Sequence, residues 1–236
     1  MKFKAVIFDL FGTLVPNFSS QGYNDALKQM AVTLSLPPDD FRQAWFSTSS
    51  YRNASDSQDC TSGIEYICRK LGVIPQARDI ELAVEIRLNY IRQVMTPQPY
   101  AIDTLSVLKA EGYKTGLISN CSHEIPVIWP ESSLAPFIDV TVFSCSVNIR
   151  KPDPRIFRLT AERLGIRLDE CLYVGDGGSQ ELSAALTVGM YPVLIRPDAE
   201  SVEHHLMNRE EWDGPEISTL EDVLIVLRDG LDSIIP

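Results

Sequence analysis

The sequence lacks the features by which membrane, exported and nucleic-acid-binding proteins are recognised. No apolar run approaches the roughly 18 residues of a membrane-spanning helix, and Asp9 interrupts the first apolar run too early for a signal peptide. Lys and Arg total 21 against 32 Asp and Glu, and no basic cluster is present that could bind a phosphate backbone. We therefore expect no membrane and no nucleic acid among its partners.

The five cysteines include no close-spaced pair of the kind that binds metal, and their odd number argues against a complete disulfide framework. Most lie within apolar segments, so we expect buried free thiols and a cytoplasmic location, where thiols stay reduced. Hydrophobic residues make up 44% of the 236 residues, which is enough for the core of one domain with a smaller insert.

Five short runs are almost continuously apolar, a pattern typical of parallel strands that are covered on both faces. These runs are residues 4–10, 114–119, 140–145, 171–176 and 191–196. Helical patterns follow at 99–112 and 153–165, and a third at 218–231 opens with Ser218 and Glu221 as a capping box. The alternation predicts an α/β fold with a doubly wound, mostly parallel, Rossmann-like sheet.

Residues 17–96 break this alternation, because they contain helical patterns and no convincing strand. Pro16 and the segment TPQP at 96–99 bound the stretch. We predict an all-helical cap domain over 17–96, inserted into a core domain of residues 1–16 and 97–236. Because the insert follows the carboxyl end of the first strand, it would cover the site and select the substrate. A bundle that merely stabilises the protein is the alternative.

Polar side chains follow four of the expected strands. Asp9 ends the first, Ser119 and Asn120 end the second, Lys151 comes after the third, and Asp176 ends the fourth. Carboxylate oxygens suit Mg²⁺, while hydroxyl, ammonium and turn N–H groups suit phosphate oxygens. The combination indicates a site for a divalent cation and a phosphoryl-like anion.

The segments DLFGTL, ISN, KPD and GDGGSQE resemble the four motifs of the haloacid dehalogenase (HAD) superfamily of aspartate-nucleophile hydrolases. The resemblance covers nearly the whole chain, including a helical cap between the first two motifs. It implies that Asp9 is the nucleophile and a Mg²⁺ ligand, and that Ser119 and Asn120 hold the phosphate. By the same match, Phe11 gives its backbone carbonyl to the metal.

The resemblance further implies that Lys151 holds the nucleophile and the phosphoryl oxygens together, and that Asp176 is the second metal ligand. Glu181 falls where the fourth motif often has another acid, and we expect it near the metal without direct contact. Backbone N–H groups near Gly12 and Thr13 would orient the substrate, since a tight turn there brings the backbone close to it.

Phe11 departs from the pattern of the family's phosphatases, which carry there a second Asp that protonates the leaving group and later activates water. Phe can do neither, and general acid–base help is typically worth ~10² to 10⁴ in rate. The first interpretation is a Mg²⁺-dependent phosphatase for a small phosphorylated metabolite. Its substrate would have a good leaving group, or the cap or His123 would supply the proton.

The second interpretation is a 2-haloacid dehalogenase-type hydrolase, because those relatives carry an aromatic residue at the position of Phe11 and a halide leaves without a proton. Against it, the sequence keeps Gly175 and Asp176, and Trp45 is not followed by the arginine of those relatives but by Phe46. The third is a weakly active or non-catalytic binding protein with the same fold.

The sequence does not name the small-molecule substrate. Its scattered candidates for substrate contacts are charged residues of the cap and of the loop before Lys151, namely Arg52, Asp56, Arg69 and Arg150. We expect a monomer or a homodimer, and the sequence does not choose between them.

Overall fold

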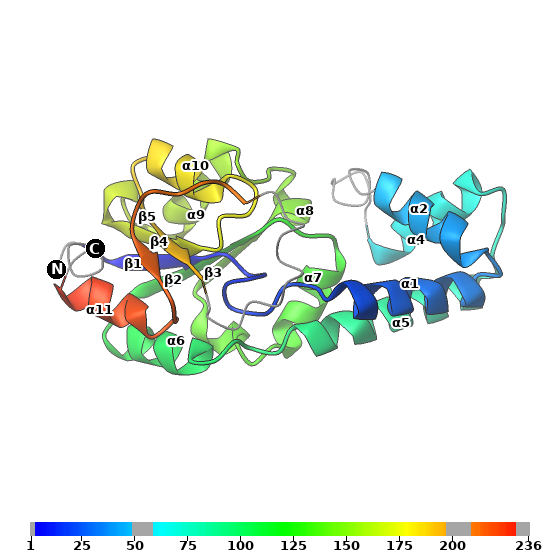
Figure 1. The fold of residues 1–236 in the computed structure, drawn as a ribbon, viewed down its shortest axis with the longest axis horizontal. Coiled ribbons are helices and arrows are strands. Elements are labelled where there is room, and N and C mark those ends of the chain that lie inside the picture. The colour runs from blue at the N-terminus through cyan, green and yellow to red at the C-terminus, as the bar shows by residue number, and fades with distance from the viewer. Residues whose placement is uncertain (1–2, 49–58, 197–208, 230–236) are drawn as a thin grey trace.

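A six-stranded parallel sheet forms the centre of the protein, whose computed structural model describes residues 3–48, 59–196 and 209–229 (Figure 1). The strand order is β3-β2-β1-β4-β5-β6, and every neighbouring pair is parallel. The predicted α/β fold with a doubly wound parallel sheet is thereby confirmed. The strands are β1 Ala5–Phe8, β2 Lys114–Ser119, β3 Val140–Phe143, β4 Cys171–Gly175, β5 Tyr191–Ile195 and β6 Glu216–Ile217.

The two central strands, β1 and β4, explain the continuous apolar runs of the sequence. All their residues are buried, since helices cover both faces of the sheet. Strand order reverses between β1 and β4, so the chain leaves these neighbours in opposite directions. Such a switch point opens a crevice at the carboxyl ends of the strands. Asp9 and Asp176, the residues that follow β1 and β4, lie at this crevice.

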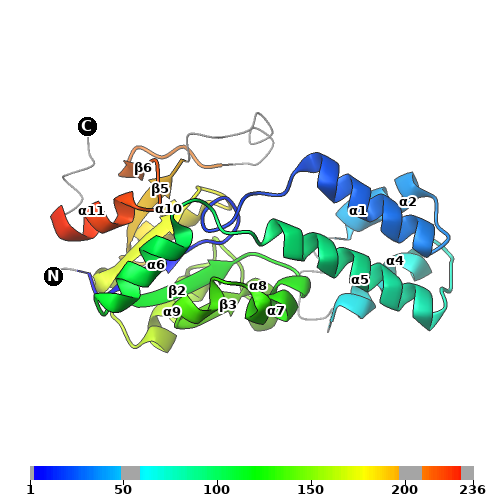
Figure 2. The ribbon, with the colours of Figure 1, turned by 90° about the horizontal axis from the view of Figure 1, so that it is seen from below.

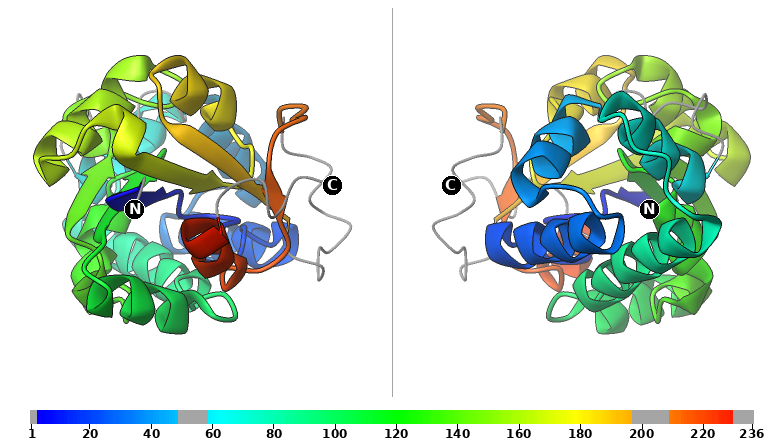
Figure 3. Two further views of the ribbon diagram at one scale, coloured as in Figure 1. Left: turned by 90° about the vertical axis from the view of Figure 1, so that its left-hand side faces the viewer. Right: turned by 90° about the vertical axis from the view of Figure 1, so that its right-hand side faces the viewer.

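Two helical layers enclose the sheet (Figures 1 and 3). Helices α6 and α11 lie on one face, and α9 and α10 lie on the other. Shorter helices, α7 and α8, follow β2 and β3. The bounds are α6 Ala101–Ala110, α7 Glu124–Ile128, α8 Ser144–Val147, α9 Pro154–Leu164, α10 Glu181–Thr187 and α11 Asp222–Asp229.

Within the described part of the chain between β1 and β2, four helices precede α6: α1 Ser20–Thr33, α2 Pro38–Ser47, α4 Cys60–Lys70 and α5 Ala77–Val94. They lie beyond the end of the sheet at which β1 ends (Figure 1), and they surround an apolar cluster of their own that includes Leu27, Phe41 and Trp45. Helices α1 and α5 lie side by side (Figure 2) and reach the sheet domain, where Tyr90 and Ile91 join its core. All four fall within the range predicted for the cap, whose boundaries stay a prediction.

The structure differs from the sequence-based expectation at two places near the C-terminal end of the sheet domain. Strand β6 was not predicted, because two residues are too few to form a recognisable apolar run. The capping box at Ser218 was wrong, because α11 begins at Asp222. The Asp222 carboxylate accepts the backbone N–H groups of Ser218 at 3.2 Å and Thr219 at 2.8 Å, so it holds the turn that precedes the helix.

All five cysteines are free thiols, as the sequence predicted. Among the described helices, none combines the length and the hydropathy needed to cross a membrane.

Candidate active site

The strand ends bring an ammonium group between two carboxylates. Lys151 is 3% exposed, and its Nζ donates to the Asp9 carboxylate and to Glu181 Oε2, the latter at 2.5 Å. The hydroxyl of Tyr173 on β4 donates to the same Glu181 oxygen at 2.8 Å. Asp9, Lys151 and Glu181 come from positions far apart in the sequence, and the sheet edge gathers them as the motif pattern predicted.

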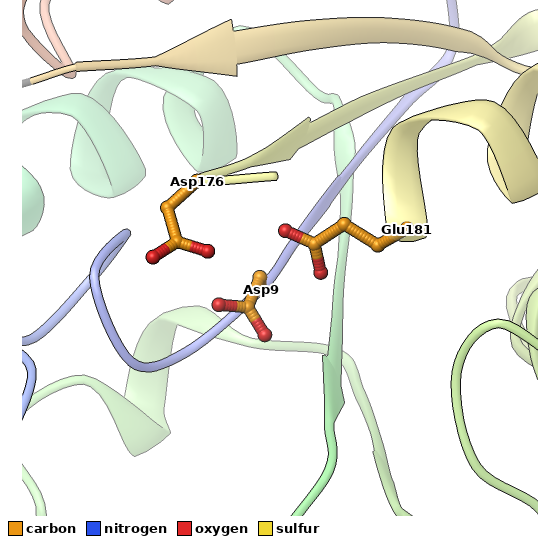
Figure 4. Close-up of side chains that lie close together, drawn as sticks. All are labelled: Asp9, Asp176 and Glu181. Carbon is orange, nitrogen blue, oxygen red and sulfur yellow. The ribbon is translucent and has the colours of Figure 1, made fainter. Parts of the chain in front are cut away.

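Asp9, Asp176 and Glu181 converge from β1, β4 and α10 (Figure 4), and each offers one oxygen within 4.8 Å of the others. Burial raises the pKa of Asp9. The charge of Lys151 lowers this pKa in part, and the charge of Asp176 raises it further. Burial and the charge of Asp9 raise the pKa of Glu181 to about 8. Burial alone would lower the pKa of Lys151, but Asp9 and Glu181 outweigh it and raise that pKa.

Carboxyl groups outnumber cations at this site. Three of them, on Asp9, Asp176 and Glu181, lie buried beside two cationic side chains, Lys151 and Arg209. A further cation bound by carboxylate oxygens would favour the ionised forms of Asp9 and Glu181, whose pKa values are raised by burial and by mutual repulsion. The donor set therefore fits a hard divalent cation.

The turn after β1 leaves room for the Asp176 carboxylate. Gly12 has φ +85°, and a Cβ at this position would collide with Asp176 Oδ2. The position therefore requires glycine for its backbone conformation and for the close approach. Asp176 Oδ2 also accepts from Asn17 Nδ2 at 3.2 Å and from Arg209 Nη2 at 3.1 Å, while its Oδ1 accepts from the Gly178 N–H at 3.0 Å.

Asn120 holds the Lys151 segment in place. Its Oδ1 accepts the Lys151 N–H at 2.8 Å, and its Nδ2 donates to the Lys151 carbonyl at 3.0 Å and to Ser179 Oγ at 3.2 Å. The side chain is thus engaged with the protein, although we expected it to hold phosphate. By contrast, the buried hydroxyl of Ser119 makes no hydrogen bond within the described residues and lies at the cavity beside Asp9, so it is available to a ligand oxygen.

The backbone N–H groups of Gly12 and Thr13 were expected to orient the substrate. In the structure they donate to the carbonyl oxygens of Val15 at 2.7 Å and Leu10 at 3.4 Å, so they are engaged within the turn.

Two cavities adjoin at Phe11. A small one of about 120 Å³ is lined by both strand-end aspartates, Lys151 and Ser119. A larger one of about 430 Å³ lies between the sheet domain and helices α1, α2 and α5. Phe11, Phe18 and Asn120 line both cavities. The ring of Phe11 packs on that of Phe18 with centroids 4.5 Å apart, so an apolar wall stands where the family's phosphatases carry an acid.

The remaining candidates lie away from both cavities or outside the described residues. Arg52 and Asp56 lie outside the described residues. Arg69 is exposed on α4, 4.0 Å from Glu65. Arg150 is exposed, and His123 is not among the residues that line either cavity.

The residues near the site that were not predicted from the sequence include Asn17, Arg87, Tyr173 and Arg209. Arg87 and Tyr173 left a signal, because each puts a polar group into an otherwise apolar pattern. Arg87 continues the buried stripe of α5 one turn after Ala83, and Tyr173 lies in a fully buried strand. Asn17 and Arg209 lie in irregular segments without a pattern.

Comparison with known proteins agrees with this geometry. Residues 3–189 match the family model of haloacid dehalogenase-like hydrolases. The chain is 26% identical to the glyceraldehyde 3-phosphate phosphatase of Methanopyrus kandleri, over 82% of this chain and 84% of that protein. It is 25% identical to (S)-2-haloacid dehalogenase 1 of a Pseudomonas species, over 81% of this chain and 84% of that protein.

The fold of a 2-haloacid dehalogenase from Pseudomonas syringae superposes with a TM-score of 0.74, at 20% identity, over 96% of this chain and 99% of that one. Phosphatases and dehalogenases thus both stand among the relatives, and both are hydrolases. The alternative of a non-catalytic binding protein finds no support among them. With a family match over most of its length, this chain belongs to the haloacid dehalogenase-like hydrolases.

Proposed function

We propose that the protein is a Mg²⁺-dependent phosphatase that acts on a small phosphorylated metabolite, with Asp9 as nucleophile. The observation that carries the proposal is the ion pair of Asp9 with Lys151, inside a small cavity whose carboxylates outnumber its cations. Such a cavity suits a divalent cation and a phosphoryl dianion together. The glyceraldehyde 3-phosphate phosphatase among the relatives supports the same reaction class.

The carboxylates of Asp9 and Asp176 and the backbone carbonyl of Phe11 would hold the Mg²⁺ ion. When bound, the ion supplies positive charge that neutralises phosphoryl oxygens. The ammonium of Lys151 supplies a second positive charge beside Asp9. The buried hydroxyl of Ser119, which lines the small cavity and makes no hydrogen bond within the described residues, would donate to the phosphoryl group and orient it.

In the first step an oxygen of Asp9 attacks phosphorus, and the bond to the leaving oxygen breaks with its electron pair on that oxygen. This leaves an aspartyl phosphate and the leaving anion. A carboxylate or an aryl oxide can depart as the anion, whereas an alkoxide then takes a proton from solvent. In the second step water attacks phosphorus, which restores Asp9 and releases inorganic phosphate. Phe11 assists neither proton transfer, so substrates with stable leaving anions are favoured.

A second candidate is hydrolysis of a carbon–halogen bond, favoured by the aromatic ring of Phe11 at the entrance to the small cavity. In that reaction Asp9 attacks the carbon that carries the halogen, the halide leaves without a proton, and water hydrolyses the aspartyl ester. The (S)-2-haloacid dehalogenase among the relatives supports this alternative.

A substrate panel tests the choice. Aryl, acyl and alkyl phosphates and 2-haloacids are incubated with the protein, with Mg²⁺ and with a chelator, and release of phosphate or halide is measured. We expect phosphate from aryl and acyl phosphates, lost with the chelator, and no halide. Halide release that continues in the chelator would overturn the proposal in favour of the second candidate.

A further inference from the structure

Arg87 on α5 is a buried cation that the chemistry at Asp9 does not use. Its side chain is 4% exposed, and its Nε donates to Glu124 Oε1 on α7 at 3.2 Å. Four aromatic rings surround the guanidinium, with centroids 4.8 to 5.9 Å from Cζ; these are Phe18, Tyr23, Trp45 and Tyr90. The rings and the ion pair fix the group at one wall of the larger cavity.

The guanidinium is not fully satisfied. Its Nη1 is buried and has no hydrogen-bond partner within the described residues, and the same holds for the hydroxyl of Tyr90, one turn along α5. Buried donors without partners are rare, and a bound ligand or ion is a common explanation. An acceptor oxygen in the cavity would satisfy the donor on Arg87.

The residues that line the larger cavity favour an anion. Among the described residues they include two arginines, Arg87 and the exposed Arg42 of α2, and no carboxylate. Glu124 balances the charge of Arg87 but does not line the cavity. Aromatic and aliphatic side chains form much of the remaining wall, including Phe11, Tyr23, Phe46 and Ile91. The cavity therefore has a wall of mixed polar and apolar side chains, with positive charge at Arg87 and Arg42.

We propose that the larger cavity binds a second anionic group of the substrate, a carboxylate or a further phosphate, at Arg87, with Arg42 at the rim. The substrate class would then be a small organic phosphate with two acidic groups, one at Asp9 and the other in the cap. Phe11 and Phe18, which line both cavities, would contact the carbon frame between the two groups. This inference rests on the proposed phosphatase function.

Matched substrates test the inference. 4-Carboxyphenyl phosphate and 4-carbamoylphenyl phosphate have nearly the same shape, but only the first has a second charge, and phenylene 1,4-bisphosphate tests phosphate in its place. The readout is the ratio of kcat/KM for each substrate with a second anionic group to kcat/KM for the amide. Comparison of this ratio between variants cancels differences in leaving-group ability and in overall activity.

The variants distinguish a role of Arg87 in substrate binding from a role in stabilising the fold. Removing Arg87 alone would take away the cation that pairs with the buried Glu124 carboxylate and could destabilise the protein. Arg87→Gln is therefore combined with Glu124→Gln, which leaves an uncharged pair, and thermal melting checks the fold. We expect this double variant to lose at least tenfold of the preference for the charged substrates. Glu124→Gln alone should keep or increase the preference, because it leaves the charge of Arg87 unbalanced.

Arg78→Gln is the matched control, since Arg78 is an exposed arginine on the same helix and lines neither cavity. It should keep the preference of the wild type. An unchanged preference in the folded double variant would overturn the inference and leave Arg87 with a structural role. So would a wild type that does not prefer either charged substrate.

Binding without turnover distinguishes failure of this inference from failure of the proposed function. Calorimetry compares 4-(phosphonomethyl)benzoate with its benzamide analogue. Preference for the benzoate in the wild type, and its loss in the double variant, would support the anion site even if no phosphate ester were hydrolysed. Equal binding of both analogues, or binding of neither, would overturn it even in an active phosphatase.

Discussion

Hydrolysis by this protein should depend steeply on the leaving group, because Phe11 stands where a phosphatase of this family carries its general acid. Its half-buried ring lies at the junction of the two cavities, packed 4.5 Å from the ring of Phe18. An alkoxide must then leave the phosphorus without a proton. An aryl oxide or a carboxylate needs no such help.

The expected size of the effect follows from general acid catalysis, which contributes ~10² to 10⁴ in rate. At 1.36 kcal/mol for each factor of ten, this corresponds to about 2.7 to 5.4 kcal/mol of activation free energy for an alkyl phosphate. Phe11→Asp places a carboxyl group at the wall between the cavities and should recover part of this difference. The change also removes the ring pair with Phe18, which costs about 0.5 to 1.5 kcal/mol of stability.

The assay measures kcat/KM for nitrophenyl, phenyl and methyl phosphates with the wild type, Phe11→Asp and Phe11→Leu. Phe11→Leu is the control, since it removes the ring but adds no acid. We expect a steep dependence in the wild type and in Phe11→Leu, and a flatter one in Phe11→Asp. A flat dependence in the wild type, with chemistry shown to be rate-limiting, would mean that another residue donates the proton.

Three further predictions concern the metal site, the turn after β1 and the cysteines. Asp176→Asn should weaken Mg²⁺ binding by more than about tenfold. Loss of a residue that merely positions a metal ligand costs about tenfold or more, and loss of a ligand itself should cost at least as much. Equal affinity by calorimetry would exclude Asp176 as a ligand. Gly12→Ala should lower the free energy of unfolding by about 1 to 3 kcal/mol in urea titration, because φ is +85° there and a Cβ meets Asp176; unchanged stability would show that the turn can relax. Burial and the charge of Glu124 raise the pKa of Cys60 to about 12, so its thiolate is scarce at pH 8. Iodoacetamide should therefore alkylate Cys60 more slowly than free cysteine at that pH by a factor of more than about ten, since the greater nucleophilicity of a high-pKa thiolate offsets only part of its scarcity, and equal rates would contradict the raised pKa.

Most of the fold was predictable because its signals are local. The five longer strands are runs of apolar residues that are buried throughout in β1 and β4 and for the most part in the others. The glycine that ends α9, Gly165, has the positive φ expected of a helix terminator. The start of α11 was not predictable in the same way. The side chains of Ser218 and Asp222 can both accept backbone N–H groups in the turn before the helix. Only the packing of the chain decides which of them does so.

The site was predictable only in part. The motif residues follow strands, so the order of the strands in the sheet brings Asp9, Lys151 and Asp176 together. The contacts of Arg87 with Glu124 and of Arg209 with Asp176 join segments 37 and 33 residues apart, with no shared pattern to connect them. Which carboxylate a buried arginine meets depends on how helices and loops pack in space.

The central claim is that Asp9 attacks phosphorus and that no residue at position 11 then activates water. One measurement tests both parts of this claim: the covalent state of Asp9 during steady-state hydrolysis of acetyl phosphate with Mg²⁺. Acetate leaves easily, whereas water must attack the aspartyl phosphate without a base at Phe11, so the second step should be the slower one. After acid quenching, mass spectrometry should find a phosphoryl group on the peptide that contains Asp9 in a large fraction of the enzyme, and none in Asp9→Asn. Steady release of phosphate with no phosphoryl group on that peptide would contradict the account.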